Sequence, residues 1–216
     1  MTTKPDGALL ALHKHGAIGG FFVEDDQIDI ILDTKIFHVG EVGRMDRIDN
    51  GCTVEVMAEA KARGCVTNLD AFASTSENLS LVAPLLPYTD HFMPSDEEAM
   101  ALSGLSDFEE ITQFLLDQSP GAVILTLGEG GVIYRDKNAT RFDLPSFMID
   151  VFCTCGCGDR FNTGFASGLH LKKSTEDCLY LGEASPAQNA LGLGSQAVVE
   201  SLDQTMNFIE TTSLRV

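Results

Sequence analysis

Short apolar runs alternate along the first half of the chain with longer stretches in which apolar residues recur every three or four positions. Runs rich in β-branched and aromatic residues predict buried strands, and the longer period predicts amphipathic helices. Strands that alternate with helices are typical of an α/β fold with a parallel sheet. The expected strands cover residues 35–39, 65–69, 91–93 and 122–127, and the expected helices between them cover 54–62, 96–102 and 108–116.

Each expected helix has a polar residue at its start that could accept a hydrogen bond from a free backbone N–H group. Asn50 or Thr53 precedes the first helix. Ser95 precedes the second, with Glu98 three residues later, and Ser106 precedes the third, with Glu109 three residues later. Both pairs have the spacing of a capping box.

The pattern changes after residue 127. Two short alternating segments, 131–135 and 140–144, predict a hairpin. From Gly158 onward, aromatic and aliphatic residues at four-residue steps predict a helix, in which Gly164 and Gly168 would allow a close neighbour. A further helix is expected near residues 175–189.

The charge balance limits the partners of this chain. With 14 Lys plus Arg against 32 Asp plus Glu, the net charge is −18, which disfavours binding to nucleic acid and to anionic lipid. An anionic substrate such as ATP would therefore need backbone N–H groups at a helix start. Hydrophobic residues make up 44% and charged residues 21%, which is ordinary for a globular protein of one domain.

Targeting signals and the cysteines favour a cytoplasmic location. No apolar run approaches the roughly 18 residues of a membrane span, and residues 1–7 are too polar for a signal peptide. Cys153, Cys155 and Cys157 form one tight group and do not resemble a disulfide framework, so we expect reduced thiols. They also lack the second ligand pair of a structural zinc site.

The clearest candidate for chemistry is the segment 154–159, which follows an apolar run and directly precedes an expected helix. Gly156 and Gly158 allow a sharp turn whose N–H groups would converge on an anion at the helix start. Asp159 could then accept the proton of an attacking hydroxyl. The alternative is an ordinary glycine-rich turn with Asp159 as a helix cap.

Two further segments have both a structural and a functional interpretation. Thr126, Gly128 and Gly131 end the most hydrophobic strand, where a hydroxyl and bare backbone could approach a nucleotide, or where glycines could simply form a turn. Glu98 could help to organise Mg²⁺ through water molecules, or serve only in the capping box with Ser95.

In this order and spacing, these segments resemble the ribokinase-like family, the PfkB-type carbohydrate kinases. Residues 153–159, followed by Phe161 and a glycine-containing helix, match the family signature Asp-Thr-x-Gly-Ala-Gly-Asp. Thr126, Gly128 and Gly131 match its Thr-x-Gly-x-x-Gly element, and the segment from Ser95 to Glu98 matches its Asn-x-x-Glu element.

The resemblance implies a ribokinase-like fold, ATP, Mg²⁺ and transfer of the γ-phosphoryl group to a sugar hydroxyl. It assigns the catalytic positions to Asp159, Gly156 and Gly158 and the metal position to Glu98. The nucleotide positions are Thr126, Gly128, Gly131 and Cys157.

The resemblance covers only part of the family's fold. Residues 1–25 would be a remnant of the lid region and residues 26–216 an α/β core, together one domain. The opening strand and the usual sugar-binding elements have no counterpart, which would leave unpaired strand groups at a sheet edge and is compatible with a homodimer.

Two positions depart from the family pattern, since Cys153 replaces an Asp and Ser95 replaces an Asn. A non-catalytic nucleotide-binding or interaction protein is therefore the alternative function.

Overall fold

The computed structural model describes residues 2–3, 9–10, 16–45, 47–49, 52–72, 75–198 and 201–215. Its contacts divide the chain into two compact units. The strand unit consists of Lys14–Thr126 and Ile133–Arg141, and the helix unit consists of Met1–His13, Leu127–Val132 and Phe142–Val216. The expectation of one domain stays a prediction. Of the expected lid remnant, the described parts include a short antiparallel pair, β1 (Thr2–Thr3) and β2 (Leu9–Leu10).

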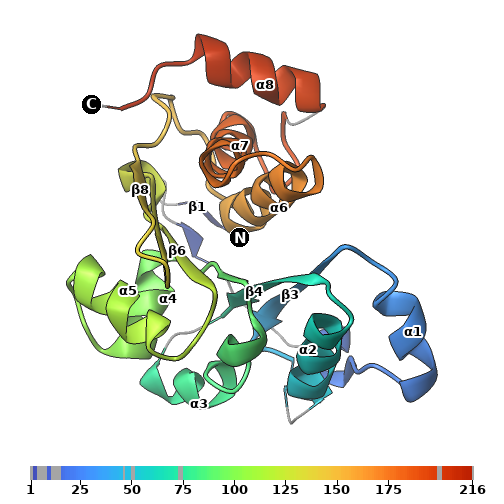
Figure 1. Ribbon diagram of the computed structural model, residues 1–216. Helices are drawn as coiled ribbons and strands as arrows, with labels where there is room; N and C mark the ends of the chain where they lie inside the picture. Colours follow the sequence, from blue (N-terminus) through green and yellow to red (C-terminus); the bar gives the residue numbers. More distant parts are fainter. Residues whose placement is uncertain are drawn as a thin grey trace. The chain divides into compact units, whose positions relative to one another are not determined.

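A six-stranded sheet follows the chain in the order β3-β4-β5-β6-β7-β8. The first four strands pair in parallel and confirm the expected α/β pattern (Figure 1). Among the described residues β3 pairs only with β4, so it lies at an edge of the sheet. The strands are β3 (Ile36–Val42), β4 (Val66–Ala71), β5 (His91–Phe92), β6 (Ala122–Thr126), β7 (Val132–Asp136) and β8 (Arg141–Leu144).

The expected hairpin is formed by β7 and β8. Asp136 closes its connection, because its carboxylate accepts the N–H groups of Asn138 and Thr140, both at 2.8 Å. These bonds lower the pKa of the Asp136 carboxyl against the opposing effect of burial.

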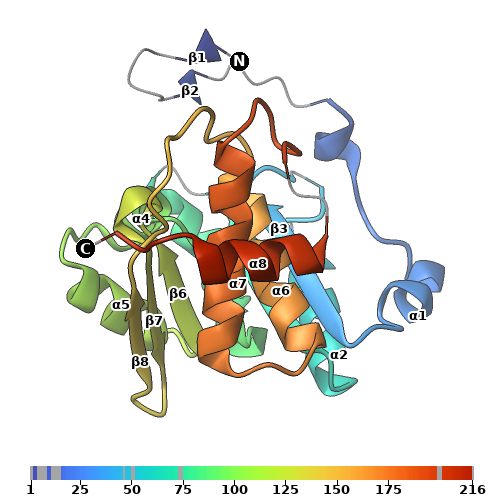
Figure 2. The same cartoon turned by 90° about the horizontal axis from the view of Figure 1, so that it is seen from above.

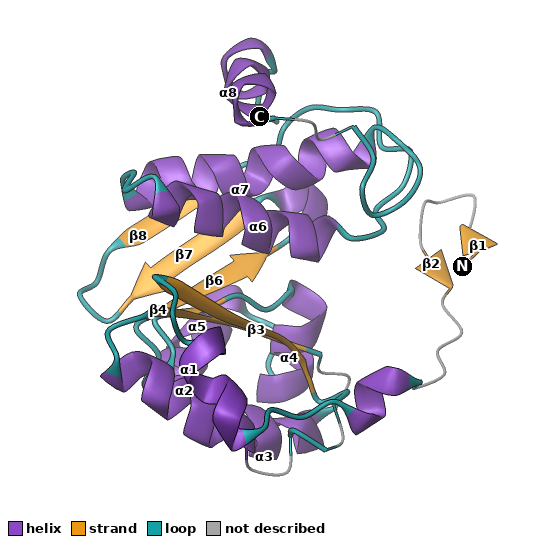
Figure 3. Ribbon diagram, turned by 90° about the vertical axis from the view of Figure 1, so that its right-hand side faces the viewer, coloured by secondary structure: helices purple, strands orange, loops and turns teal. Residues whose placement is uncertain are grey.

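Helices of the strand unit lie along its parallel strands, and Figure 3 shows α2 beside β3 and β4. Leu32, Val56, Ala60 and Cys65 form a buried cluster there. The helices are α1 (Ile28–Ile31), α2 (Cys52–Ala62), α3 (Leu79–Val82), α4 (Asp96–Ser103) and α5 (Phe108–Leu116), with 3₁₀ turns η1 (Ala17–Gly20), η2 (Asp25–Gln27), η3 (Ser76–Asn78) and η4 (Leu86–Tyr88).

The helix starts confirm one expected cap and correct two. Ser95 and Glu98 form the complete capping box of α4. For α5 the expectation of Ser106 was wrong, because Asp107 occupies the cap and accepts the N–H groups of Glu109 and Glu110. Thr53 lies inside α2, where its hydroxyl donates to the Ile48 carbonyl, and Asn50 lies outside the described residues.

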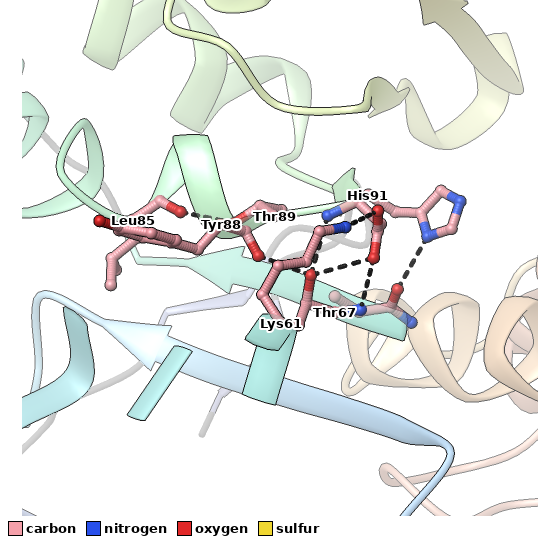
Figure 4. A network of polar contacts seen from close by, with 8 residues as sticks. Lys61, Thr67, Leu85, Tyr88, Thr89 and His91 are labelled. Atoms are coloured by element: carbon pink, nitrogen blue, oxygen red, sulfur yellow. Dashed lines mark hydrogen bonds and ion pairs between the residues drawn. The ribbon is translucent and has the colours of Figure 1, made fainter. Parts of the chain in front are cut away.

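A polar network joins the amino ends of β4 and β5 to the end of α2 (Figure 4). The Asp90 carboxylate pairs with Lys61 and accepts the Thr67 N–H at 3.0 Å. Burial raises the pKa of Asp90, but these donors outweigh burial and leave the pKa lowered. His91 Nδ1 lies 2.9 Å from Asn68 Oδ1, and burial lowers the His91 pKa to about 4.

In the helix unit, α6 (Cys157–His170) and α7 (Thr175–Ala190) pack side by side, and α8 (Leu202–Thr211) lies across α7 (Figure 2). Glycines allow the close approach, as the four-residue pattern predicts. A Cβ at Gly164 would collide with the Leu181 carbonyl, and one at Gly168 would lie 2.8 Å from Cys178 Cα. No described helix combines the length and apolar character needed to cross a membrane.

Candidate active site

A tight turn delivers the chain to the start of α6. Gly156 is the residue before the helix and has φ 76°, a left-handed conformation that glycine adopts without strain. A Cβ at this position would lie 2.5 Å from Ser195 Cβ and 2.9 Å from Ser195 Cα. Both backbone conformation and space therefore require glycine at Gly156.

The N–H groups of this turn are only partly used. The Cys157 N–H donates to the Thr154 carbonyl at 3.2 Å, whereas the N–H groups of Gly158 and Asp159 have no hydrogen-bond partner among the described residues. The space around the Gly158 Cα is open, since a Cβ there would meet no atom within 4 Å. Two free donors at the start of a 14-residue helix are suited to hold an anion.

The Asp159 carboxylate is exposed and has no partner among the described residues. Its backbone carbonyl accepts the Thr163 hydroxyl at 2.8 Å. Asp159 is therefore not a side-chain helix cap, which was the alternative interpretation of the sequence. A free carboxylate next to two free N–H groups is available as a proton acceptor.

Two contacts hold the turn in place, and the sequence pattern did not point to either. Asn189 at the end of α7 is fully buried; its Nδ2 donates to the Cys155 carbonyl at 2.9 Å and its Oδ1 accepts the Ala197 N–H at 3.1 Å. Arg160 Nε donates to the Ser195 carbonyl at 3.2 Å. The turn and the loop after α7 are thus fixed to each other.

The three cysteines of the turn have different environments. Cys153 is buried, and hydrogen bonds from the N–H groups of Gly194 and Cys155 lower the pKa of its thiol. Burial raises the pKa of the Cys157 thiol, whose sulfur lies 3.8 Å from the Pro186 carbonyl oxygen. In the described part of the chain no group of three or more His, Cys, Asp or Glu is placed to hold a metal ion.

A second carboxyl group lies close to this turn. Glu183 of α7 is 7% exposed, has no partner in the described residues, and its charge acts on the Cys157 thiol. Burial raises the pKa of Glu183 to about 8. No local pattern pointed to Glu183, because nothing adjacent in the chain marks the residue as buried.

The second glycine segment also lies in the helix unit. After β6, the 3₁₀ turn η5 (Gly128–Gly130) is closed by the Leu127 N–H, which donates to the Gly131 carbonyl at 2.8 Å. Gly131 has φ 86°, and a Cβ there would collide with the Leu144 carbonyl. Gly128, with φ 55°, has open space around it. The turn therefore exposes bare backbone at Gly128.

Thr126 and the Ser95–Glu98 segment lie together in the strand unit. The Thr126 N–H donates to the Pro94 carbonyl at 3.2 Å, and Thr126 bridges to Ser95. Glu98 Oε2 accepts both the N–H and the hydroxyl of Ser95, at 2.9 and 2.7 Å. Burial raises the pKa of Glu98, and these two bonds offset it in part. The capping role is confirmed, while the metal role stays a prediction.

The resemblance implies two groups at this site, a phosphate and Mg²⁺. The residues present fit the phosphate more fully than the metal ion. The free N–H groups of Gly158 and Asp159 fit a phosphate. Glu98 Oε1 has no partner among the described residues and could accept from a metal-bound water, which is the kind of contact that Mg²⁺ commonly makes.

Known proteins resemble this chain over most of its length. The sequence profile of the pfkB family of carbohydrate kinases matches residues 14–202. A ribokinase from Haemophilus influenzae is 28% identical over 131 residues, which are 58% of this chain and 42% of the relative. An ATP-dependent 6-phosphofructokinase from Thermoanaerobacterium thermosaccharolyticum is 30% identical over 135 residues, which are 62% of this chain and 41% of the relative.

Solved structures share the fold. Arabidopsis thaliana ribokinase, complexed with ribose and ATP, superposes with a TM-score of 0.74 at 21% identity, covering 87% of this chain and 59% of that one. Aminoimidazole riboside kinase from Salmonella enterica gives a TM-score of 0.71 at 22% identity, covering 80% and 62%. The chain spans 38% to 62% of the length of the curated relatives it matches. With the family profile matched from residue 14 to residue 202, the chain belongs to the pfkB family of carbohydrate kinases.

Proposed function

We propose that this protein is an ATP-dependent phosphotransferase that acts on a hydroxyl of a sugar or sugar-like compound, with Asp159 as general base. The observation that carries the proposal is the unpartnered Asp159 carboxylate beside the free Gly158 N–H at the start of α6. Family membership supports phosphoryl transfer. One solved neighbour, from E. coli, is bound to ATP and Mg²⁺.

In the proposed reaction, Asp159 accepts the proton of the acceptor hydroxyl as its oxygen bonds to the γ-phosphorus and the bond to the ADP oxygen breaks. The N–H groups of Gly158 and Asp159 stabilise the charge on the transferring phosphoryl group. Mg²⁺ would supply further neutralisation of phosphate charge, and Glu98 would orient its water ligands. Gly156 allows the turn that orients the N–H groups of Gly158 and Asp159.

The nucleotide would approach the bare backbone at Gly128 and Gly131, the Thr126 hydroxyl and the backbone of Cys157. Because the Cys157 N–H is already bonded to Thr154, its part is to shape the turn rather than to donate. Cytoplasmic location and a homodimer remain predictions.

A second candidate is a protein that binds nucleotide without catalysis. Cys153 stands where the family signature has an Asp, and its buried thiol accepts N–H groups of the turn itself. That arrangement can preserve the turn and the phosphate contacts while activity is lost.

Substitution of Asp159 by Asn tests the proposal. We expect ADP release over a panel of sugars to fall at least about a hundredfold, because the general base is lost, while Mg-ATP affinity measured by calorimetry changes little. Asp203→Asn, on the exposed start of α8, is the control and should leave turnover unchanged. Full turnover in the Asp159→Asn protein would remove the mechanism. ATP binding without sugar-dependent ADP release in the wild type would favour the second candidate.

A further inference from the structure

The turn after β3 is rigidly built. The Arg44 N–H donates to the Glu41 carbonyl at 3.0 Å, and the Asp49 carboxylate accepts the N–H groups of Gly43 and Met45, both at 2.9 Å. Gly43 has φ 101°, and a Cβ there would lie 2.6 Å from the Phe72 carbonyl oxygen. These contacts define the backbone of the turn, and with it the point from which the Arg44 side chain extends.

The guanidinium of Arg44 is held against an aromatic ring. Its Cζ lies 3.5 Å from the centroid of Phe72, which follows β4, and the Arg44 side chain is only 17% exposed. The distance is well within the range of a cation–π contact. The ring removes water from one face of the cation.

Among the described residues, the hydrogen-bonding capacity of Arg44 is largely unused. Its one charged partner in this part of the chain is Glu41, whose Oε2 lies 3.4 Å from Nη1. Nε is buried and has no partner among the described residues. A guanidinium has five N–H donors in a planar fork that matches a carboxylate or phosphate. A cation so poorly satisfied and so little hydrated is suited to receive an anion.

Glu41 is a weak partner that a ligand could replace. It has φ 60°, an uncommon value for a residue with a side chain, and lies at the register break of β3. Its side chain is 47% exposed, and 3.4 Å is too long for a strong charge-assisted bond. The carboxylate or phosphate of a ligand could therefore take the place of the Glu41 carboxylate.

The position of Arg44 within the strand unit is suited to ligand binding. Arg44 and Phe72 follow the carboxyl ends of β3 and β4, as the Ser95–Glu98 segment follows β5, and ligands of open α/β sheets bind beyond these ends. The charge of Glu41 also acts on the Glu98 carboxyl. We propose, resting on the proposed function, that Arg44 binds the carboxylate or phosphate of an anionic sugar ligand, so that this protein prefers sugar acids or sugar phosphates to neutral sugars.

Calorimetry of the full chain with two matched pairs of compounds tests this proposal. D-Gluconate is compared with D-glucitol, and D-fructose 6-phosphate with D-fructose, because the members of each pair differ by the anionic group. We expect the anionic member of one pair to bind at least about tenfold more tightly, as a hydrogen-bonded charge should provide. The pair that shows the preference identifies carboxylate or phosphate as the group recognised.

Variants assign the preference to Arg44. Arg44→Gln should abolish it, and Arg44→Lys should keep part of it, because a lysine retains the charge but not the fork. Arg47→Gln is the matched control, since Arg47 also lies over an aromatic ring, with Cζ 3.2 Å from the Phe22 centroid, but is exposed. It should bind like the wild type. Circular dichroism melting confirms that each variant is folded.

Three results would overturn the proposal: equal binding of both members in both pairs, an unchanged preference in folded Arg44→Gln, or binding of none of the four compounds. All measurements are repeated in the Asp159→Asn protein, where binding should persist. Failure of the kinase mechanism would appear only in turnover, and failure of the Arg44 assignment only in affinity.

Discussion

At the scale of single residues, two carboxyl groups at the α6–α7 pair have opposite environments. Asp159 is exposed at the start of α6 and lacks a partner among the described residues, so it remains available to accept a proton. Glu183 is 93% buried in α7 without a partner in the described chain, and burial raises its pKa to about 8. The first group is free to accept a proton in the proposed reaction, and the second is a source of pH-dependent instability.

Glu183→Gln should remove a pH dependence of stability. In the unfolded chain the carboxyl ionises near pH 4.5, whereas in the folded protein it stays protonated up to about pH 8. The unfolded state therefore binds fewer protons than the folded state across this window, and the free energy of unfolding falls as the pH rises through it. The loss by pH 8 should be on the order of a few kcal/mol.

Urea unfolding between pH 5 and pH 8.5 measures this effect. The slope of stability against pH should be smaller in Glu183→Gln than in the wild type, and the variant should be the more stable at pH 8. Glu210→Gln, at an exposed position of α8, is the control and should keep the wild-type slope. Equal slopes in all three proteins would show that Glu183 is not buried as described.

At the scale of elements, helix caps show how neighbouring polar residues compete. Ser106 and Asp107 stand next to each other before α5, and the Ser106–Glu109 spacing predicted Ser106 as the cap. The structure uses Asp107, whose Oδ1 lies 2.9 and 3.0 Å from two free N–H groups. The negative charge also interacts favourably with the positive end of the helix dipole.

Asp107→Ala should destabilise the protein by about 1 kcal/mol, because two donors at the start of α5 lose their acceptor. Ser106→Ala is the matched control one residue away and should change stability by less than about 0.5 kcal/mol. Denaturant midpoints at constant slope measure both. A larger loss in Ser106→Ala than in Asp107→Ala would reverse the assignment of the cap.

At the scale of the whole molecule, the net charge of −18 is the dominant property. Like charges repel one another more in a compact chain than in an expanded one, so the folded state carries an electrostatic cost. Ion pairs act against this cost locally, as in the pairing of Arg135 and Arg141 with Glu109.

Salt should therefore stabilise the protein. Raising NaCl from about 0.01 M to about 0.15 M shortens the Debye length from roughly 30 to 8 Å and screens the repulsion. We expect the melting temperature to rise over this range, and to rise equally in KCl at the same ionic strength. A fall in melting temperature, or a rise with only one of the two salts, would show that general repulsion is not the cause.

The sequence by itself determined the features that depend on neighbouring residues. Alternating periods predicted the parallel strands and the helices between them, since burial of one face requires that spacing. The Ser95–Glu98 box and the turn at Gly156 could also be predicted, because their hydrogen bonds and dihedral angles involve only adjacent positions.

Only the tertiary structure decided the contacts between distant residues. Asn189 reaches Cys155 across 34 positions, Arg44 meets Phe72 across 28, and Glu183 is buried by side chains that no local pattern identifies. Each depends on burial and on the geometry of packed elements, and these are set by the fold as a whole. Interactions between neighbouring residues thus specified the strands, helices and turns. The packing of these elements decided which of their polar groups are left without a partner.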